Sequence, residues 1–569
     1  MSSSHDFFKK RQAGVLLHPT SLPETPGNGD LGQHAYRFVD FLADCNIALW
    51  QMLPLGPPDD DLSPYRARSV HAANPLLISL ENLVQKGWLR KDSSPTTQQA
   101  LEHELQLLTQ QGWHQENVEK IDLANRLEHS PFKDGFCPPN IDDIGIHYRY
   151  ARLKEARSGF KKNANETERA AYATFIKENA HWLEDYALFR VLQAEYLKTL
   201  KVDCLKAIKE IQHHDALNAR LCELRDSSGW WGWPTELRDR HPHALEEARQ
   251  RLSEVIEQHR FEQFVFFSQW HNLREYAHKR GVYLFGDIPI FVAEDSVDVW
   301  ANRENFLLNE NGQPTIVAGV PPDYFSETGQ RWGNPHYNWD YMKSNGFQWW
   351  IARLKSASLL FDVARIDHFR GFEASWAIPA HCKIAIEGEW IKVPGDLLFE
   401  KLQELSPEEG GLPLVAEDLG IITDEVTALR ERFNLPGMKI LQFAFEGGHE
   451  NPYLPHNHIE HCVVYTGTHD NNTTLGWFRE IPGHLQHHVC EYLHASPHDM
   501  PWPLVESAFA SKAKIAVVPM QDVLALDGNH RMNTPGVSKG NWRWRFDWNQ
   551  LSTGVNGKLQ HLSHSYGRA

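Results

Sequence analysis

The stretch LLFDVARID, from Leu359 to Asp367, says most about how this chain folds. It is mostly apolar, as a strand buried on both faces should be, and it ends in a carboxylate. Seven other runs of this kind occur along the sequence. In chain order the eight runs begin at Gly14, Ala48, Val282, Leu359, Leu412, Gly437, His461 and Lys514. We interpret them as eight buried strands.

Helical patterns separate these runs, for example EYAHKR (275–280) before the third and DEVTALRERF (424–433) after the fifth. Eight strands alternating with helices predict an α/β fold, a (β/α)8 TIM barrel that forms one catalytic domain over residues 1–569. An open, doubly wound sheet is the competing architecture. It would favour a G-x-G-x-x-G turn after the first strand, and HPTSLPETPGNGDLG (18–32) does not have that pattern.

A long segment separates the second and third runs. Residues 87–260 are charged and helical in pattern, so we expect a helical subdomain inserted between the second and third strands. This insertion and further loop insertions should lie at the C-terminal face of the barrel and shape its cleft. Trp182, Tyr186 and Phe189 share one helical face and are expected in the core. The polar tail QHLSHSYGRA (560–569) is expected to be peripheral.

The charge, the apolar runs and the cysteines of the chain indicate which partners it can bind and in which compartment it acts. The chain has 74 acidic and 57 basic residues and a net charge of -17, which argues against binding nucleic acid or anionic membranes. No run is long enough to span a membrane, and MSSSHDFFKKRQAG (1–14) lacks the apolar stretch of a signal peptide. Seven scattered cysteines without a CxxC pair indicate a reducing cytoplasm and no zinc site. The histidines of HLQHHVCEYLH (484–494) do not form H-E-x-x-H and fit a solvated helix face.

Three segments carry candidate catalytic carboxylates. They are ARIDHFRGF (364–372), LVAEDLG (414–420) and VYTGTHDNN (464–472). Each begins with an apolar, strand-like run, and the carboxylates that follow these runs are Asp367, Glu417 and Asp470. Carboxylates at the ends of parallel strands can converge on one cleft, where they can act as nucleophile, acid and base on a sugar acetal. A helix cap or a surface ion pair would explain any one of them alone. Their recurrence after three β-like runs favours a shared site.

The neighbours of these carboxylates suggest roles. Arg365 lies two residues before Asp367 and should point to the same side of the strand, where its charge favours an ionised nucleophile. Glu417 ends an apolar run, and partial desolvation should raise its pKa, as a general acid requires. Asp418 is a rival that strand alternation aims elsewhere, where it could cap the following turn.

The third segment and two loops supply candidates for sugar recognition. Asp470 and His469 could hold sugar hydroxyls and stabilise a cationic transition state, although D-N-N would also form an Asx-turn. Two Gly/Pro-punctuated loops, 63–75 and 319–337, are rich in aromatics that could stack on sugar rings or pack within the loops. Their stacking candidates are Tyr65, Tyr324, Phe325 and Trp332.

Several longer motifs resemble one known family. The chain is similar to the 4-α-glucanotransferases called amylomaltases or disproportionating enzymes, glycoside hydrolase family 77. The motifs that carry the resemblance include GVLLHPTSLP, LWQMLPLGPP, GDIPIFV, VPPDYFSETGQRWGNP, RIDHFRGF, AEDLG, PGMKILQFAF, TGTHDN, VPMQDVLAL and RMNTPGVSKGNWRWR.

The resemblance implies a function. Members have a (β/α)8 barrel with inserted subdomains, and they pass a segment of an α-1,4-glucan to the 4-hydroxyl of another glucan or of glucose. By motif, Asp367 is the expected nucleophile, Glu417 the acid/base and Asp470 the transition-state stabiliser. The expected substrate-binding residues are Arg365, His469, Tyr65, Asp323, Tyr324, Trp332 and Asp287. The implied partners are maltodextrin donors and glucose or maltodextrin acceptors, with no metal or organic cofactor.

The motifs also depart from the family pattern, and two other functions compete. Asn472 stands where many members have Asp, SVHAANP (69–75) replaces the more usual SSFAGNP, and Arg331 replaces an apolar residue. These changes bear on subsite preference and leave the three carboxylates in place. A hydrolase of the α-amylase type would use the same carboxylates with water as acceptor. A catalytically silent glucan-binding protein would have no need of all three.

Overall fold

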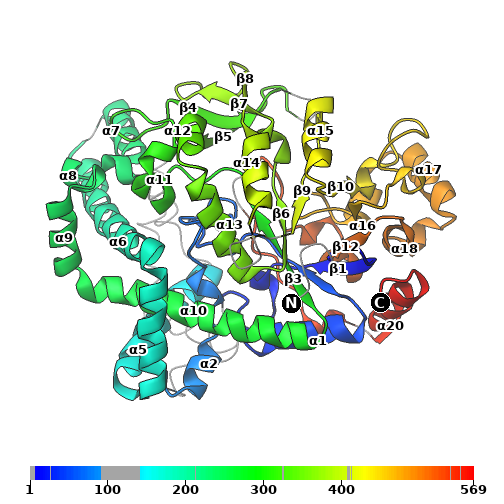
Figure 1. Ribbon diagram of the computed structural model, residues 1–569, viewed down its shortest axis with the longest axis horizontal. Coiled ribbons are helices and arrows are strands. Elements are labelled where there is room, and N and C mark those ends of the chain that lie inside the picture. The colour runs from blue at the N-terminus through cyan, green and yellow to red at the C-terminus, as the bar shows by residue number, and fades with distance from the viewer. Residues whose placement is uncertain are drawn as a thin grey trace.

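Eight parallel strands form the centre of the molecule (Figure 1). The computed structural model describes residues 7–25, 27–59, 61–90, 141–211, 213–322, 326–405, 411, 413–537, 540–551 and 553–569. The barrel strands are β1 (Gln12–Leu16), β2 (Leu49–Gln51), β3 (Tyr283–Ile288), β6 (Val363–Ile366), β9 (Leu414–Ala416), β10 (Gly437–Ile440), β11 (Cys462–Tyr465) and β12 (Ile515–Pro519). Seven of these strands fall within their predicted runs, and β1 overlaps the first run but begins two residues before Gly14, so the predicted barrel is confirmed.

The strands follow one another around the ring in the order of the chain. The hydrogen-bonded order is β10-β11-β12-β1-β2-β3-β6-β9, and every neighbouring pair is parallel. The backbone N–H of Ala416 in β9 donates to the carbonyl of Pro436, just before β10, at 2.9 Å. This contact brings the two end strands together and nearly closes the barrel.

Alternate strand residues face the two sides of the barrel wall. Ile515 and Val517 of β12 belong to one buried cluster, whereas Ala516 and Val518 belong to another. The first cluster draws residues from all eight strands, so it fills the barrel interior. The second joins the outer faces of the strands to the surrounding helices. Burial on both faces explains why these strands read as continuous apolar runs.

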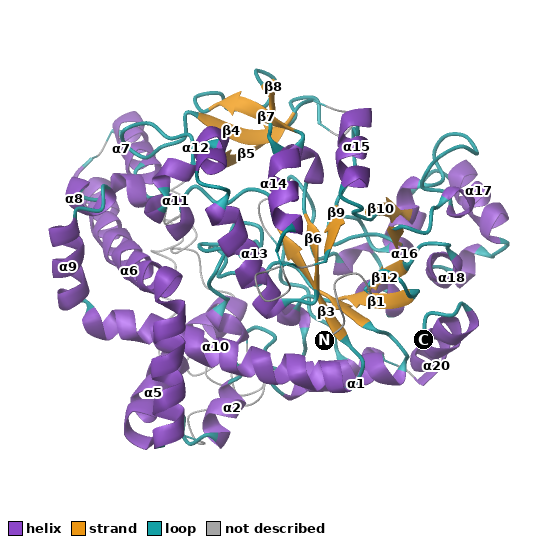
Figure 2. Ribbon diagram, viewed as in Figure 1, coloured by secondary structure: helices purple, strands orange, loops and turns teal. Residues whose placement is uncertain are grey.

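Helices surround the barrel, as Figure 2 shows by colour. Those outside the insertion are α1 (Gln33–Asp44), α11 (Val297–Ala301), α12 (Trp339–Ser344), α13 (Gln348–Leu360), α14 (Gly395–Gln403), α15 (Asp424–Arg432), α16 (Thr474–Glu480), α17 (Gly483–Leu493), α18 (Trp502–Ala510), α19 (Met520–Val523) and α20 (Thr553–Ser565). The exposed histidines of α17 lie opposite its buried Leu485 and Val489, as expected for a solvated helix face. Among the described residues, no helix combines the length and apolarity needed to cross a lipid bilayer.

The predicted helical insertion lies between β2 and β3, at the left of Figure 1. The described helices between these two strands are α2 (Leu80–Gln85), which precedes the predicted bounds 87–260, α5 (Ile141–Asn163), α6 (Glu166–Glu210), α7 (His214–Asp226), α8 (Thr235–Arg238), α9 (Pro242–Arg251) and α10 (Ser253–Lys279). A capping box starts α6: Asn165 accepts from the Glu168 N–H at 2.9 Å, and Glu168 accepts from the Asn165 N–H at 3.0 Å. Trp182, Tyr186 and Phe189 of α6 are buried, as predicted. Residue 260 lies inside α10, which continues to the barrel.

A second sheet, absent from the sequence prediction, stands beside the barrel (Figure 2). Its antiparallel strands are β4 (Ile316–Val320), β5 (Gln330–Pro335), β7 (Ala374–Pro379) and β8 (Glu389–Lys392), in the order β5-β4-β7-β8. It combines the loop after β3 with the loop after β6. The 319–337 segment is therefore largely a β-hairpin.

The C-terminal tail is packed, contrary to expectation. The Arg568 side chain is buried, and its guanidinium donates to backbone carbonyls at distances between 2.7 and 3.2 Å. The accepting residues are Gln12, Phe509, Ser511, Ala513 and Lys514. Leu559 and Leu562 are buried as well. The polar sequence showed no sign of this packing, in which one arginine donates to carbonyls at the end of α18 and at the N-terminal ends of β1 and β12.

Candidate active site

The candidate site continues the interior rows of the barrel strands. Phe285 and Val363 belong to the interior cluster, and a period of two places Asp287 and Arg365 on the same face. Val415 is also interior, so the same alternation brings Glu417 to the C-terminal mouth of the barrel. The apolar rows thus end in charged side chains on one face, where TIM-barrel sites form.

Arg365 bridges two of these carboxylates. Its Nη1 lies 2.6 Å from Asp287 Oδ2, and its Nη2 lies 2.6 Å from Asp367 Oδ1. Burial disfavours the guanidinium charge, but the two carboxylates outweigh burial and hold the pKa of Arg365 well above its usual range. A permanent cation thus lies at hydrogen-bond distance from the Asp367 carboxyl. The predicted pairing of Arg365 with Asp367 is therefore present.

Glu417 is held by backbone donors beside Asp367. The N–H of His368 donates to Oε2 at 2.7 Å, and the N–H of Leu419 donates to Oε1 at 2.9 Å. Glu417 is only 9% exposed, and burial raises its pKa to about 7; the Asp367 carboxylate adds to this, whereas Arg365 and the two N–H groups oppose it. A carboxyl that keeps its proton near neutral pH suits a general acid.

The rival carboxylate Asp418 faces away from this site. Its Oδ1 accepts from the Met438 N–H at 2.7 Å, and its Oδ2 lies 3.2 Å from Arg430 Nε. Asp418 thus joins β9 to β10 and α15. Strand alternation separates the two neighbours as predicted, and Glu417 is the one that faces Asp367.

Asp470 projects from the loop after β11. Its side chain is 48% exposed, and its Oδ1 lies 3.3 Å from His469 Nε2. The Asp470 carboxylate contacts Asn533 and His469, and the turn in this loop is closed instead by Asn471, whose Oδ1 accepts from the Thr468 N–H at 2.8 Å. The Asp470 carboxylate therefore does not take part in this turn and is exposed to the cleft.

Tyr65 connects the two halves of the site. Its hydroxyl donates to Asp287 Oδ2 at 2.6 Å, and its ring stacks on His469 with centroids 5.1 Å apart. Contacts thus run without a break from Asp470 through His469, Tyr65, Asp287 and Arg365 to Asp367.

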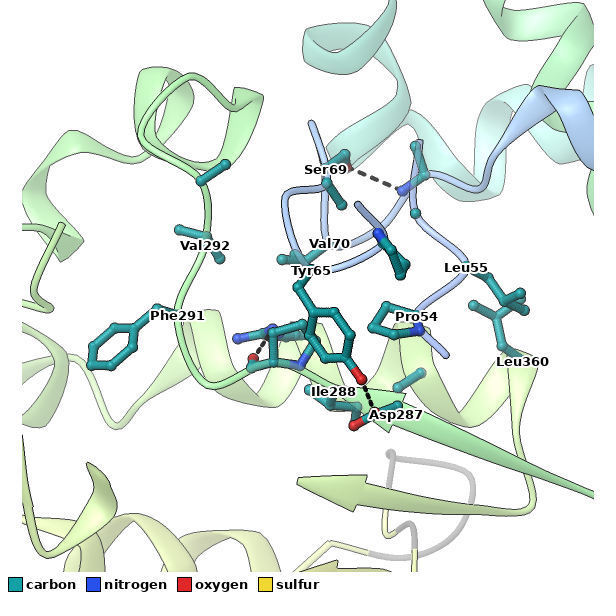
Figure 3. A pocket seen from close by; sticks show the side chains of 18 of the residues that line it. Pro54, Leu55, Tyr65, Ser69, Val70, Asp287, Ile288, Phe291, Val292 and Leu360 are labelled. Carbon is teal, nitrogen blue, oxygen red and sulfur yellow. Dashed lines mark hydrogen bonds between the residues drawn. The ribbon is translucent and has the colours of Figure 1, made fainter. Parts of the chain in front are cut away.

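A small cavity lies behind the Tyr65–Asp287 hydrogen bond (Figure 3). Its volume is about 60 Å³, and apolar residues such as Leu55, Val70 and Phe291 line most of it. Burial raises the pKa of Asp287 to about 7, against the effect of the Arg365 cation. A cavity of this size has room for about two water molecules. It therefore borders the site and is not the sugar cleft.

Trp332 is the remaining predicted sugar-contacting residue that the structure describes. Trp332 of β5 is 37% exposed, and its ring meets His368 edge-on at 4.9 Å between centroids. Asp323 and Tyr324 lie outside the described residues. Arg331, one of the departures from the family pattern, is exposed and donates to the Ala380 carbonyl at 3.0 Å.

Two residues at the site received no role from the sequence. Asn533 Nδ2 donates to Asp470 Oδ1 at 2.6 Å, and Arg531 Nη2 donates to the Asp470 carbonyl at 2.9 Å. Both belong to RMNTPG, one of the motifs that carried the resemblance. No periodicity could assign them, because they meet Asp470 only through the tertiary fold. In the described part of the chain, no group of three or more His, Cys, Asp or Glu side chains is arranged to hold a metal ion.

Comparison with known proteins gives the family. The profile of glycoside hydrolase family 77, described as 4-alpha-glucanotransferase, matches residues 17–551. The chain belongs to glycoside hydrolase family 77. It is 44% identical over 568 residues to the 4-alpha-glucanotransferase of Thermus thermophilus, covering 98% of this chain and 99% of that one. It is 41% identical over 563 residues to the Synechocystis sp. enzyme, covering 98% of each chain. The family assignment makes it a glycosyltransferase that acts on α-1,4-glucans.

Solved family 77 structures agree with the fold. The amylomaltase from Streptococcus agalactiae, in complex with acarbose, matches with a TM-score of 0.82 at 32% identity, over 98% of this chain and 100% of that one. The amylomaltase from Corynebacterium glutamicum matches with a TM-score of 0.68 at 15% identity, over 100% of this chain and 76% of that one, and shows the fold alone. The plant relative from Arabidopsis thaliana, 39% identical, is chloroplastic or amyloplastic; the match covers 98% of this chain and 86% of that one.

Proposed function

We propose that this family 77 enzyme moves a segment of an α-1,4-glucan to the 4-hydroxyl of another glucan or of glucose by a retaining double displacement. The observation that carries the proposal is the unbroken series of contacts from Asp470 to Asp367, with Glu417 fixed by the residue after Asp367. A retaining mechanism needs a nucleophilic carboxylate and a second carboxyl that first gives and then takes a proton.

In the first step, a carboxylate oxygen of Asp367 attacks the anomeric carbon of the donor glucan. The bond from that carbon to the glycosidic oxygen breaks, and Glu417 gives its proton to the departing oxygen. Asp470, with its Asn533 hydrogen bond, faces the positive charge that develops on the sugar ring. A covalent glucosyl ester on Asp367 and a shortened glucan result.

In the second step, the 4-hydroxyl of an acceptor takes the place of the departed glucan. Glu417 removes its proton as the oxygen attacks the anomeric carbon, and the ester bond to Asp367 breaks. The α-1,4 bond reforms with retained configuration. The sugars around the reacting bond are bound by Asp287, Arg365, His469, Tyr65 and Trp332. By their motif, Asp323 and Tyr324 also bind sugar.

We propose maltodextrins as donors and glucose or maltodextrins as acceptors in a cytoplasmic pathway of maltodextrin or glycogen use. The related streptococcal amylomaltase bound acarbose, which supports an oligosaccharide cleft here. The free thiols of Cys45, Cys204, Cys222, Cys382, Cys462 and Cys490 support a reducing compartment. We further propose that residues 87–260 act as a helical subdomain within one catalytic domain.

Incubation of the purified enzyme with maltotriose alone tests the transfer reaction. The expected products are glucose and a ladder of longer maltodextrins, with little gain in reducing ends. Shorter products with rising reducing ends would assign a hydrolase instead. The absence of any product would leave a glucan-binding protein. E417Q serves as the matched variant, because it keeps the shape of the site and removes the proton donor.

A further inference from the structure

Asp522, a buried carboxylate that is not one of the reacting groups, accepts hydrogen bonds from the loop that carries Asp470. Asp522 lies in α19, directly after β12, and is fully buried. The hydroxyls of Thr466 and Thr474 each donate to its Oδ2 at 2.6 Å, and the N–H of Thr474 donates to its Oδ1 at 2.7 Å. Both oxygens are thus occupied, as a buried carboxylate requires.

The two threonines mark the two ends of the loop. Thr466 follows β11 directly, and Thr474 is the first residue of α16. The segment between them, 467–473, holds His469 and Asp470. One side chain from the helix that follows β12 therefore joins the beginning and the end of this segment.

A second residue also contacts both ends of the same loop. Gln442 Nε2, from the turn after β10, donates to the Asn472 carbonyl at 2.8 Å, and its backbone N–H donates to the Thr466 carbonyl at 3.3 Å. The loop is thus held from both neighbouring strands. Asp522 differs from Gln442 because it binds both loop ends through a single carboxylate.

We propose that Asp522 is a positioning residue, which holds the 466–474 loop so that Asp470 and His469 keep their places in the cleft. The inference rests on the proposed role of Asp470. A reacting geometry must be held within a fraction of an ångström, and a misplacement of about 1 Å can cost about 100-fold in rate. A carboxylate that only stabilised the fold would lower the melting temperature and leave the rate per folded molecule unchanged.

The matched control is Asp362, another largely buried carboxylate with a comparable set of partners. It accepts from Arg274 Nη2 at 2.7 Å and from the Leu284 N–H at 2.7 Å. Because it directly precedes β6, it lies at the N-terminal end of the barrel, opposite the site. D362A should lower the melting temperature and leave kcat unchanged.

The test measures kcat and KM for maltotriose and the melting temperature of D522A, D522N and D362A. D522A should lose about 30- to 100-fold in kcat with little change in KM, because it weakens a contact made in the transition state. D522N should recover most of this rate, since an amide of the same shape can accept from the Thr474 N–H and donate to both hydroxyls. A wild-type kcat in D522A would overturn the inference.

A double-mutant cycle with Asp470 separates this inference from the proposed function. If Asp522 acts through Asp470, adding D522A to D470N should cause no further loss, whereas D362A should behave alike in both backgrounds. An equal loss from D522A in both backgrounds would refute the inference alone. An active D470N would instead refute the proposed role of Asp470.

The variant T466V provides a second test should D522A fail to fold. It removes the hydrogen bond from Thr466 to Asp522 and should lose about fivefold in kcat, whereas T466S keeps the hydroxyl and should not.

Discussion

The backbone N–H of His368 donates to Glu417 Oε2 at 2.7 Å, so the residue after the proposed nucleophile holds the proposed acid. The two carboxylates come from β6 and β9, which are adjacent in the barrel. Because the donor is a backbone N–H, this contact holds the Glu417 carboxyl without the help of another side chain. It also means that any shift of the 367–368 turn moves both reacting groups together.

Replacing Glu417 tests the acid role. E417Q should lower kcat on maltotriose by about 100- to 10,000-fold, because the amide cannot protonate the departing oxygen. A donor with a leaving group that needs no proton, such as a maltosyl fluoride, should restore the first step. Pre-steady-state rates of the first step with the two donors, such as the burst of fluoride release, provide the measurement. Equal losses on both donors would exclude Glu417 as the acid.

The raised pKa of Glu417 predicts how the rate varies with pH. The acid must be protonated at the start of the first step, and burial raises its pKa to about 7. Glu417 is protonated below that value and loses its proton above it, so kcat/KM should fall as the pH rises through about 7. A pH profile of kcat/KM checks this. A rate that stays constant well into the alkaline range would contradict the assignment.

Asn533 is expected to support Asp470. N533A removes the 2.6 Å hydrogen bond to Asp470 Oδ1 and should lower kcat by about 10- to 100-fold, the effect of one hydrogen bond to a charged group. Kinetics on maltotriose provide the measurement. Asn457, which binds backbone carbonyls of a surface turn at 2.7 and 2.9 Å, is the matched control, and N457A should keep its kcat. Similar rates in the two variants would remove Asn533 from the site.

Trp332 should contribute to sugar binding. W332A should raise the KM for maltodextrins about three- to tenfold and change kcat less, because stacking on a bound sugar stabilises the ground state and the transition state alike. Trp502, a partly buried tryptophan on α18, is the control. If W332A and W502A show the same KM, the stacking role of Trp332 fails.

The buried tail predicts a stability effect separate from catalysis. R568A removes five buried hydrogen bonds and should cost about 3 kcal/mol of folding free energy. The Phe509 and Ser511 carbonyls keep a bond from Arg11, and the Lys514 carbonyl keeps one from the Gln12 N–H. H564A, at an exposed position of α20, should cost almost nothing. Urea unfolding of both variants measures the difference. Identical midpoints would mean that the Arg568 contacts do not stabilise the fold.

The barrel could be predicted because its strands are buried on both faces. Val363, Val415 and Val463 face the interior, while their neighbours pack against helices, so each strand reads as an apolar run. The strands of the second sheet could not be recognised from the sequence in this way. Its strand β5 is largely exposed and lies in a Gly/Pro-rich loop, and its partners come from two separate segments.

The site was predictable only where its chemistry is local. Arg365 and Asp367 lie two residues apart, and Glu417 ends an apolar run, so the sequence indicates both. Asn533 and Asp522 act on the Asp470 loop from 63 and 48 residues away. No pattern links such distant positions, because the barrel curvature alone brings them together.

Trapping the covalent intermediate tests the central claim most directly. A maltosyl fluoride donor given to E417Q should form the glycosyl-enzyme quickly and release it slowly, because the second step lacks its base. Mass spectrometry of the digested protein should then find the sugar on the peptide that contains Asp367. A sugar on Asp470 or Asp287 would contradict the assignment of the nucleophile, and turnover with inverted product and no adduct would contradict the double displacement itself.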